Sequence, residues 1–269
     1  MLFVAGFLAL FLLLWLLFVP AGPLIGRALG HLGHRTAAFR YRDYLPVVIL
    51  LLAGAIVTAA AGDQFLDLAE HVQSGSETLQ RIDAEVHEWA RGRHSAAATL
   101  FFTFFTYVGT PVGLGLIVAA VVTGLAMQGR YRWCAYLAGT AIIGALLVIE
   151  LKLLFARARP DLAAALRSAH GYSFPSGHAM GSTIVFGALS YLIVRAHAPW
   201  WKRAAGLAAA ATAILAVSLS RVYLGVHWIS DIGAGIAAGV LWATVATVAY
   251  EAFRRIRMVR AFRRMKDEG

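Results

Sequence analysis

Seven apolar runs, each near or above the length needed to cross a bilayer, constrain the fold of this sequence more than any other feature. An α-helix needs about 20 predominantly apolar residues to cross the hydrocarbon core, and it satisfies its backbone hydrogen bonds within the segment. The sequence therefore predicts an all-α, polytopic integral membrane helical bundle. The predicted spans lie at roughly residues 2–19, 45–62, 98–127, 133–152, 178–195, 204–220 and 228–250.

The composition assigns nearly the whole chain to one membrane domain. Hydrophobic residues make up 60% of the 269 residues, charged residues 14%, and the mean hydropathy is +0.70. Soluble domains are closer to about half apolar and about a quarter charged. The single cysteine, Cys134, lies inside a predicted span, so no disulfide can form within the chain.

Three segments are predicted from this pattern. Residues 1–44 form an N-terminal transmembrane helix and a basic cytoplasmic loop, residues 45–250 the membrane domain, and residues 251–269 a basic cytoplasmic tail. A secretory signal peptide is the alternative for residues 2–19. No basic segment precedes this run and no small-residue cleavage site follows it, which favours a retained helix.

The distribution of charge predicts the orientation of the bundle. A net charge of +10 would suggest a nucleic-acid partner in a soluble protein. Here sixteen of the 24 Lys and Arg residues fall on one side, in the links at 20–44, 128–132 and 195–203 and in the tail. By the positive-inside rule that side is cytoplasmic. We therefore expect no nucleic-acid partner, and a protein of the bacterial inner membrane whose opposite face meets the periplasm.

The segment at 63–97, on the opposite side, carries seven acidic residues against three arginines. Ser74 and Glu77 form a capping-box pattern in this segment. Apolar residues then follow at helical spacing, at Leu79, Ile82, Val86 and Trp89. The pattern predicts a short amphipathic helix on the outer membrane surface. A solvated connector helix without a functional role is the alternative.

Three polar clusters stand at the extracytoplasmic ends of the predicted spans. The first is KLLFARARP, which contains Lys152 and Arg159. The second is PSGH, which runs from Pro175 to His178. The third is SRVYLGVHWISD, which contains Arg221, His227 and Asp231. Polar residues of this kind are rare within membrane domains unless they serve a function, so the three clusters predict a single site.

The third cluster predicts an activated histidine. His227 and Asp231 are four residues apart, which places them on one face of the last predicted helix. An aspartate that accepts the Nδ1 proton of a histidine fixes the tautomer. Nε2 of His227 is then free to act as a nucleophile or a base.

The second cluster predicts a phosphate-binding helix start beside a proton donor. Gly177 allows the backbone to approach a ligand closely. A helix that begins near His178 points its free amide groups and its dipole at that ligand. His178 itself can donate a proton to a departing oxygen.

Three cations complete the predicted site: Lys152, Arg159 and Arg221. Their convergence is unfavourable unless an anion lies between them. The guanidinium groups match the oxygens of a phosphoryl group. The sequence shows no carboxylate cluster and no His/Cys set with metal-ligand spacing. We therefore expect fixed cations to stabilise the phosphoryl group, with no metal and no cofactor.

The order and spacing of these clusters, K-x6-RP, PSGH and SR-x5-H-x3-D, resemble those of the type 2 phosphatidic acid phosphatases. That superfamily also contains bacterial acid phosphatases and vanadium haloperoxidases. Every fixed position of the three motifs is matched. The resemblance covers roughly residues 45–250, and the predicted span at 2–19 lies outside the six-helix core that is typical of the family.

What the resemblance implies is a two-step phosphoryl transfer. His227 would attack phosphorus and form a phosphohistidine, while Asp231 orients it. His178 would protonate the departing oxygen and then activate the water that releases phosphate. The phosphate-binding residues implied are Lys152, Arg159, Ser176, Gly177 and Arg221.

The expected substrate is a lipid phosphate at the extracytoplasmic face, either a phosphomonoester or a pyrophosphate. Undecaprenyl pyrophosphate and phosphatidate- or phosphatidylglycerophosphate-type lipids are the leading candidates, because the motifs recognise phosphate and leave the tail to the lateral opening between helices. A lipid A 1-phosphatase and a non-catalytic lipid-phosphate binder or transporter are the alternatives. A vanadium haloperoxidase is disfavoured, because those enzymes are soluble.

Overall fold

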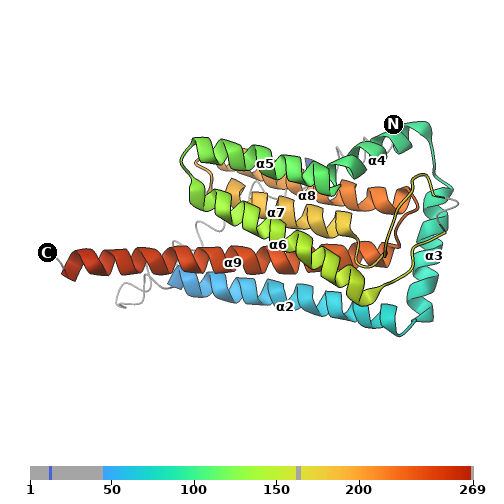
Figure 1. The fold of residues 1–269 in the computed structure, drawn as a ribbon, viewed down its shortest axis with the longest axis horizontal. Helices are drawn as coiled ribbons and strands as arrows, with labels where there is room; N and C mark the ends of the chain where they lie inside the picture. Colours follow the sequence, from blue (N-terminus) through green and yellow to red (C-terminus); the bar gives the residue numbers. More distant parts are fainter. Residues whose placement is uncertain (1–11, 14–44, 162–164, 268–269) are drawn as a thin grey trace.

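The computed structural model describes residues 12–13, 45–161 and 165–267, and the helices in this part of the chain form one elongated bundle (Figure 1). Five of them are long and apolar enough to cross a membrane, and a bent helix pair provides a sixth candidate. The predicted all-α membrane bundle is confirmed. The expected span at 2–19 falls almost wholly outside the described residues. The helices are α2 (Leu45–Gln73), α3 (Glu77–Arg91), α4 (Ala96–Val108), α5 (Pro111–Met127), α6 (Tyr131–Phe155), α7 (Gly177–Arg195), α8 (Trp200–Tyr223) and α9 (Ile229–Asp267).

Helices α2 and α9 run side by side along the bundle, and α3 lies across the end where α9 begins (Figure 1). α9 continues without a break from Ile229 to Asp267, so the expected final span and residues 251–267 of the basic tail form one helix. α2 is also longer than the predicted span at 45–62. It ends at Gln73, just before Gly75, whose φ of 67° is a conformation that favours glycine.

The predicted span at 98–127 is not one straight helix, because the chain bends by 58° between α4 and α5, and the two helices together remain one candidate span. Gly109 ends α4, and Thr110 caps α5 by accepting a hydrogen bond from Gly113 N at 3.0 Å. Pro111 occupies the first turn of α5, where its missing N–H costs nothing. The bend brings the last turn of α4 to the mouth of the polar site.

Helix α3 confirms the predicted amphipathic helix but not its predicted cap. Ser76, rather than Ser74, caps the helix and accepts a hydrogen bond from Leu79 N at 3.5 Å. Ser74 instead donates to the carbonyl of His71. One face of α3 packs on α8 and α9 through Val86 and Ala90, so the helix closes the end of the bundle.

Close packing between α7 and α9 fixes the two helix starts that carry the site. A Cβ atom added at Gly235 would lie 2.8 Å from the Ser176 carbonyl oxygen, and one at Gly239 would lie 2.6 Å from Thr183 Cβ. Only glycine allows this approach. At the same seam Ser176 N donates to the Asp231 carbonyl at 3.0 Å, which ties the start of α7 to the start of α9.

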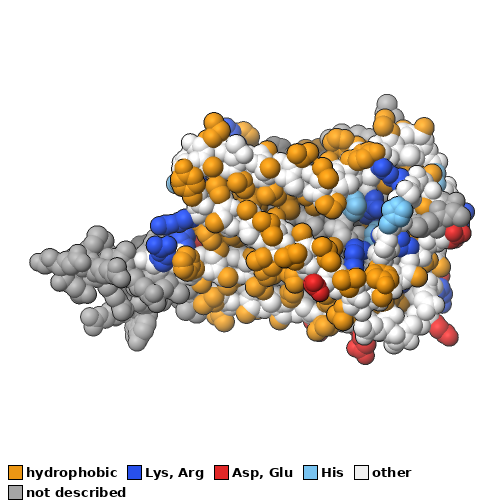
Figure 2. Space-filling view, in the orientation of Figure 1, with side chains coloured by type: hydrophobic (Ala, Val, Ile, Leu, Met, Phe, Trp, Pro, Cys, Tyr) orange, Lys and Arg blue, Asp and Glu red, His pale blue; other side chains and the backbone are white. Residues whose placement is uncertain are grey.

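The outer surface of the bundle is suited to lipid. Apolar side chains cover the visible flank, while Lys, Arg and His side chains gather towards its two ends (Figure 2). Large apolar residues are exposed on α4, α5 and α6, as at Leu100, Leu116 and Leu154. Patches of this extent are unfavourable in water and natural in a bilayer.

Candidate active site

The three polar clusters predicted from the sequence meet at the α3 end of the bundle. α6 supplies Lys152, α7 supplies His178, and α8 supplies Arg221. The loops before α7 and α9 supply Arg159 and His227. These five side chains line one cavity, so segments far apart in sequence converge as predicted.

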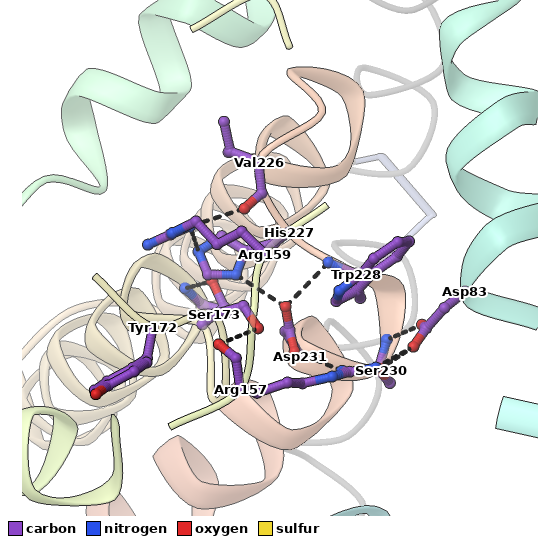
Figure 3. A network of polar contacts seen from close by, with 12 residues as sticks. Asp83, Arg157, Arg159, Tyr172, Ser173, Val226, His227, Trp228, Ser230 and Asp231 are labelled. Carbon is purple, nitrogen blue, oxygen red and sulfur yellow. Dashed lines mark hydrogen bonds and ion pairs between the residues drawn. The ribbon is translucent and has the colours of Figure 1, made fainter. Parts of the chain in front are cut away.

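His227 and Asp231 are in contact, although not in the predicted way. α9 begins at Ile229, so His227 lies in the preceding loop and not on the helix. Its Nδ1 is still 3.1 Å from Asp231 Oδ2, and the two side chains are only 2% and 0% exposed. Asp231 Oδ2 also accepts a hydrogen bond from Trp228 N at 3.0 Å (Figure 3). The aspartate therefore caps α9 and turns the loop so that His227 faces it.

The contacts of Arg159 fix the tautomer of His227. Arg159 Nη1 lies 3.1 Å from His227 Nε2 (Figure 3). A guanidinium can only donate, so Nε2 must accept and the imidazole proton must sit on Nδ1, facing Asp231. Burial, with the nearby charges of Arg159, Arg221 and Lys152, lowers the pKa of His227 well below its ordinary value. The ring is therefore neutral, and its Nε2 lone pair is directed at the guanidinium of Arg159.

Backbone carbonyls hold Arg159 itself. Its Nε donates to the Gly171 carbonyl at 2.9 Å, and Nη2 to the His170 carbonyl at 3.0 Å. Nη1 donates to the Val226 carbonyl at 2.8 Å (Figure 3). Arg159 thus joins the loop before α7 to the loop before α9, and it contacts His227 without a carboxylate partner among the described residues.

Arg221 and His178 carry polar atoms without partners. Arg221 Nη1 donates to Thr106 Oγ1, next to the bend between α4 and α5, while its buried Nε has no hydrogen bond among the described residues. His178 lies in the first turn of α7, in hydrogen-bond contact with the Thr106 backbone. Its buried Nε2 is likewise unpaired within the described chain. Buried polar groups left unpaired are costly, so both atoms indicate a place for a ligand.

Lys152 and Gly177 lie on the other wall of the cavity. Lys152 Nζ donates to the Tyr172 carbonyl at 2.6 Å and is 3.5 Å from the Ser173 carbonyl. A Cβ at Gly177 would approach Val148 Cγ1 to 3.1 Å and Lys152 Cε to 3.5 Å. Glycine therefore keeps the start of α7 open beside the lysine.

Ser176 differs from the other predicted phosphate-binding residues. It is fully buried, and its hydroxyl accepts from Ala179 N at 3.5 Å as the N-cap of α7. It is not among the residues that line the cavity. A direct contact between Ser176 and phosphate stays a prediction.

The cavity joins this polar end to an apolar groove. Its volume is about 670 Å³, and it extends from His227 and Arg221 between α5, α6 and α7. Small residues shape the groove, including Gly115 on α5 and Ala145 on α6. A ligand with an anionic head and an apolar tail matches this division.

Sequence reasoning missed two charged residues of the site, Asp83 and Arg157. Arg157 Nη1 donates to Asp231 Oδ1 at 2.7 Å, and Arg157 Nη2 donates to Asp83 Oδ2 at 2.7 Å (Figure 3). Arg157 stands in the same KLLFARARP stretch as Arg159. Asp83 lies on the inward face of α3, one residue beyond the apolar Ile82. The sequence signal for Asp83 was an acidic residue on the predicted apolar face of an amphipathic helix, where a buried partner is needed.

Within the ranges 45–161 and 165–267, no group of three or more His, Cys, Asp and Glu side chains is arranged to hold a metal ion. The positive charges of the site come instead from Lys152, Arg159 and Arg221. None of the three forms an ion pair with a carboxylate in the described part of the chain. The positive charge of the cavity is therefore suited to binding an anion.

Comparison with known proteins agrees with this geometry. The sequence profile of the PAP2 superfamily matches residues 132–255. The chain is 39% identical over 88 residues to phosphatidylglycerophosphatase B of Bacillus subtilis, a match that covers 32% of this chain and 42% of that relative. It is 32% identical over 139 residues to decaprenylphosphoryl-5-phosphoribose phosphatase of Mycobacterium tuberculosis, covering 50% of this chain and 70% of that relative.

The fold has a solved counterpart in a transmembrane PAP2-type phosphatidylglycerolphosphate phosphatase from Bacillus subtilis. The two structures superpose with a TM-score of 0.62 and 23% sequence identity, over 72% of this chain and 96% of that one. With the family profile and the mycobacterial relative, this likeness establishes the lineage. The chain belongs to the PAP2 superfamily and has the fold of its membrane lipid phosphatases.

Proposed function

We propose that this protein removes phosphate from the head group of a membrane lipid, with His227 as the nucleophile. The observation that carries the proposal is the arrangement around Nε2 of His227. Asp231 holds the proton on Nδ1. Cations that form no ion pair with a carboxylate in the described chain line the cavity beside Nε2. This is the arrangement that an in-line attack on a phosphoryl group requires.

In the first step His227 Nε2 forms a bond to phosphorus while the phosphorus–oxygen bond to the lipid breaks. Lys152, Arg159 and Arg221 neutralise the phosphoryl oxygens, with the backbone at Gly177 and the cap residue Ser176 at the start of α7. His178 Nε2, unpaired in the cavity wall, donates the proton that the departing oxygen needs.

In the second step water attacks the phosphohistidine, and His178 takes the proton from that water. The nitrogen–phosphorus bond breaks, inorganic phosphate leaves, and His227 returns to its neutral form. Asp231 balances the charge on the imidazole in both steps. The fixed cations of the site do the work that a metal ion does in other phosphatases, so the reaction is metal-independent.

The apolar groove supports a lipid substrate rather than a soluble phosphate ester. A phosphate at the polar end places the tail between α5, α6 and α7, with access from the bilayer. The relatives whose names specify substrates act on phosphatidylglycerophosphate and on decaprenylphosphoryl-5-phosphoribose. Phosphomonoesters of glycerolipids, such as phosphatidylglycerophosphate and phosphatidate, and phosphomonoesters of polyprenyl lipids therefore lead the candidates, followed by undecaprenyl pyrophosphate. The positive-inside pattern supports a site on the extracytoplasmic face.

The test is phosphate release by the purified protein from a panel of these lipids in EDTA, with His227→Ala as the matched variant. The proposal expects release by the wild type and none by the variant, and the ranking of lipids identifies the substrate. Activity that survives in His227→Ala would contradict the mechanism, and abolition by EDTA alone would contradict metal independence. Tight lipid binding without release would favour a lipid-phosphate binder or transporter.

A further inference from the structure

We propose that Arg157 and Asp83 form a positioning pair that holds Asp231, and through it His227, in the reacting orientation. The inference rests on the proposed function, and it adds two residues that lie outside the three motifs. Neither Arg157 nor Asp83 lines the cavity. Their role is therefore to act through Asp231 and not to touch the substrate.

Arg157 holds the oxygen of Asp231 that His227 does not use. Asp231 Oδ2 is occupied by His227 Nδ1 and by Trp228 N. Oδ1 accepts from Arg157 Nη1 at 2.7 Å. With both oxygens occupied from different directions, the carboxylate cannot rotate away from His227.

Asp83 holds Arg157 and the start of α9 together. Its Oδ2 accepts from Arg157 Nη2 at 2.7 Å and from Ser230 Oγ at 2.6 Å. Its Oδ1 accepts from Ser230 N at 3.0 Å, and this amide, in the first turn of α9, has no partner within the helix. Asp83 is only 2% exposed, so these contacts are shielded from water. α3 therefore clamps the helix turn that carries Asp231 (Figure 3).

The charges alternate along this line of contacts. His227 meets the anionic Asp231, then the cationic Arg157, then the anionic Asp83 (Figure 3). A lone arginine beside Asp231 would draw electron density from the carboxylate and weaken its hold on the imidazole proton. Asp83 offsets that charge, which leaves Asp231 an effective acceptor when His227 becomes positive during the reaction.

Two arginines of one short loop thus hold the two nitrogens of the same ring. Arg159 contacts His227 Nε2 directly, and Arg157 fixes Nδ1 through Asp231. The first contact must break when phosphate arrives, because Nε2 is the attacking atom. The second persists through the reaction. The loss of Arg157 is therefore expected to lower kcat and to leave KM nearly unchanged.

The experiment measures kcat and KM for the best lipid phosphate with four variants: Arg157→Gln, Arg157→Lys, Asp83→Asn and the double variant Arg157→Gln/Asp83→Asn. Arg157→Gln is expected to lower kcat by about 10- to 100-fold, the cost of a small misplacement of a reacting group, with KM within about threefold. Arg157→Lys is expected to recover only part of the rate. It keeps the positive charge, but one ammonium cannot reach both carboxylates as the guanidinium does. The double variant is expected to lose no more than Arg157→Gln, since the residues act as a unit.

Arg81→Gln is the matched control, because Arg81 lies on the exposed side of α3 and its ion pair within the described residues, with Glu85, is long at 3.8 Å. It should retain wild-type kinetics. Wild-type kcat in Arg157→Gln would overturn the inference. So would a loss of rate in all four variants that merely follows a loss of folded protein, measured by thermal melting of the same samples. A wild type that releases no phosphate from any lipid would overturn the proposed function, and this inference with it.

Discussion

Helix α9 carries two buried carboxylates, Asp231 in its first turn and Glu251 near its middle, and the two are surrounded in opposite ways. Glu251 accepts hydrogen bonds from Tyr191 at 2.7 Å, from Arg254 at 2.6 Å and from Arg255 at 2.9 Å. Acid and bases are matched there, and the cluster joins α7 to α9. Asp231 is just as well bonded, but the cations that line the neighbouring cavity have no carboxylate partner in the described chain.

The difference separates a structural cluster from a binding site. The Glu251 cluster is complete, so a ligand would only disturb it. The site at the α3 end is complete on one side, where Asp231, Arg157 and Asp83 satisfy one another. It is open on the other, where Arg221 and His178 keep unpaired atoms. Cations without carboxylate partners, next to carboxylates whose hydrogen bonds are all satisfied, are expected where a protein binds and transforms an anion.

The largest effect is expected on the open side. Arg221→Gln removes a cation that forms no ion pair with a carboxylate among the described residues, together with the hydrogen bond from its Nη1 to Thr106. The loss should reduce kcat/KM by about 10² to 10³-fold, as for other groups that stabilise a developing negative charge. Steady-state kinetics on the preferred lipid measure this loss. A change of less than about threefold would mean that Arg221 is a structural residue like Arg254.

The groove should respond to a change that leaves the phosphate site untouched. A Cβ at Gly115 meets no other atom within 4 Å, so Gly115→Leu fits without strain and fills the cavity between α5 and α6. It should raise KM for a long-tailed lipid phosphate by about 10-fold and leave a short-chain phosphate ester unaffected. Gly124→Leu, at an equally open position of α5 outside the cavity, is the control. Equal effects on both substrates would place the tail elsewhere.

The closed cluster should affect stability and not turnover. Glu251→Gln removes the charge that holds Arg254 and Arg255 and weakens the bond to Tyr191. We expect a loss of about 1–3 kcal/mol, which lowers the melting temperature by several degrees. The kcat of the folded fraction should stay at the wild-type value. A selective fall in kcat would show that the Glu251 cluster is coupled to the site at the start of α9.

A smaller effect is expected from the pH dependence of stability. The pKa of His227 is lower in the folded protein than in the unfolded chain, where it is about 6.5. Below about pH 6.5 the unfolded chain therefore binds more protons, and stability falls as the pH falls. His227→Gln removes this contribution, so its melting temperature should drop less than that of the wild type between about pH 7.5 and about pH 5.5. Parallel curves would mean that His227 takes up its proton in the folded state as readily as in the unfolded one.

Much of the fold and most of the cavity-lining residues could be predicted from the sequence, because both depend on local sequence patterns. Long apolar runs predict spans, and the PSGH stretch predicts the helix start at Gly177. The bend at Gly109 was missed, since two short apolar helices read as one long run. The Gly-Thr-Pro sequence there was the signal, because it combines a helix end, a cap and a first-turn proline.

Asp83 could not be assigned for a different reason. Its partners, Arg157 and Ser230, lie 74 and 147 residues away in the sequence, so only the folded chain brings them together. The position of His227 was also misjudged, since i,i+4 spacing predicts a shared helix face while the helix begins two residues later. The contact formed anyway, because Asp231 caps the helix that follows.

The role of His227 as the nucleophile is tested most directly by trapping the phosphoenzyme. The protein would be mixed with its lipid phosphate, quenched in base, and digested for mass spectrometry. We expect an acid-labile phosphate on His227, linked through Nε2, and none in His227→Ala. Continued turnover with phosphate on another residue, or with no phosphoenzyme in wild type even when His178→Ala slows its breakdown, would contradict this role.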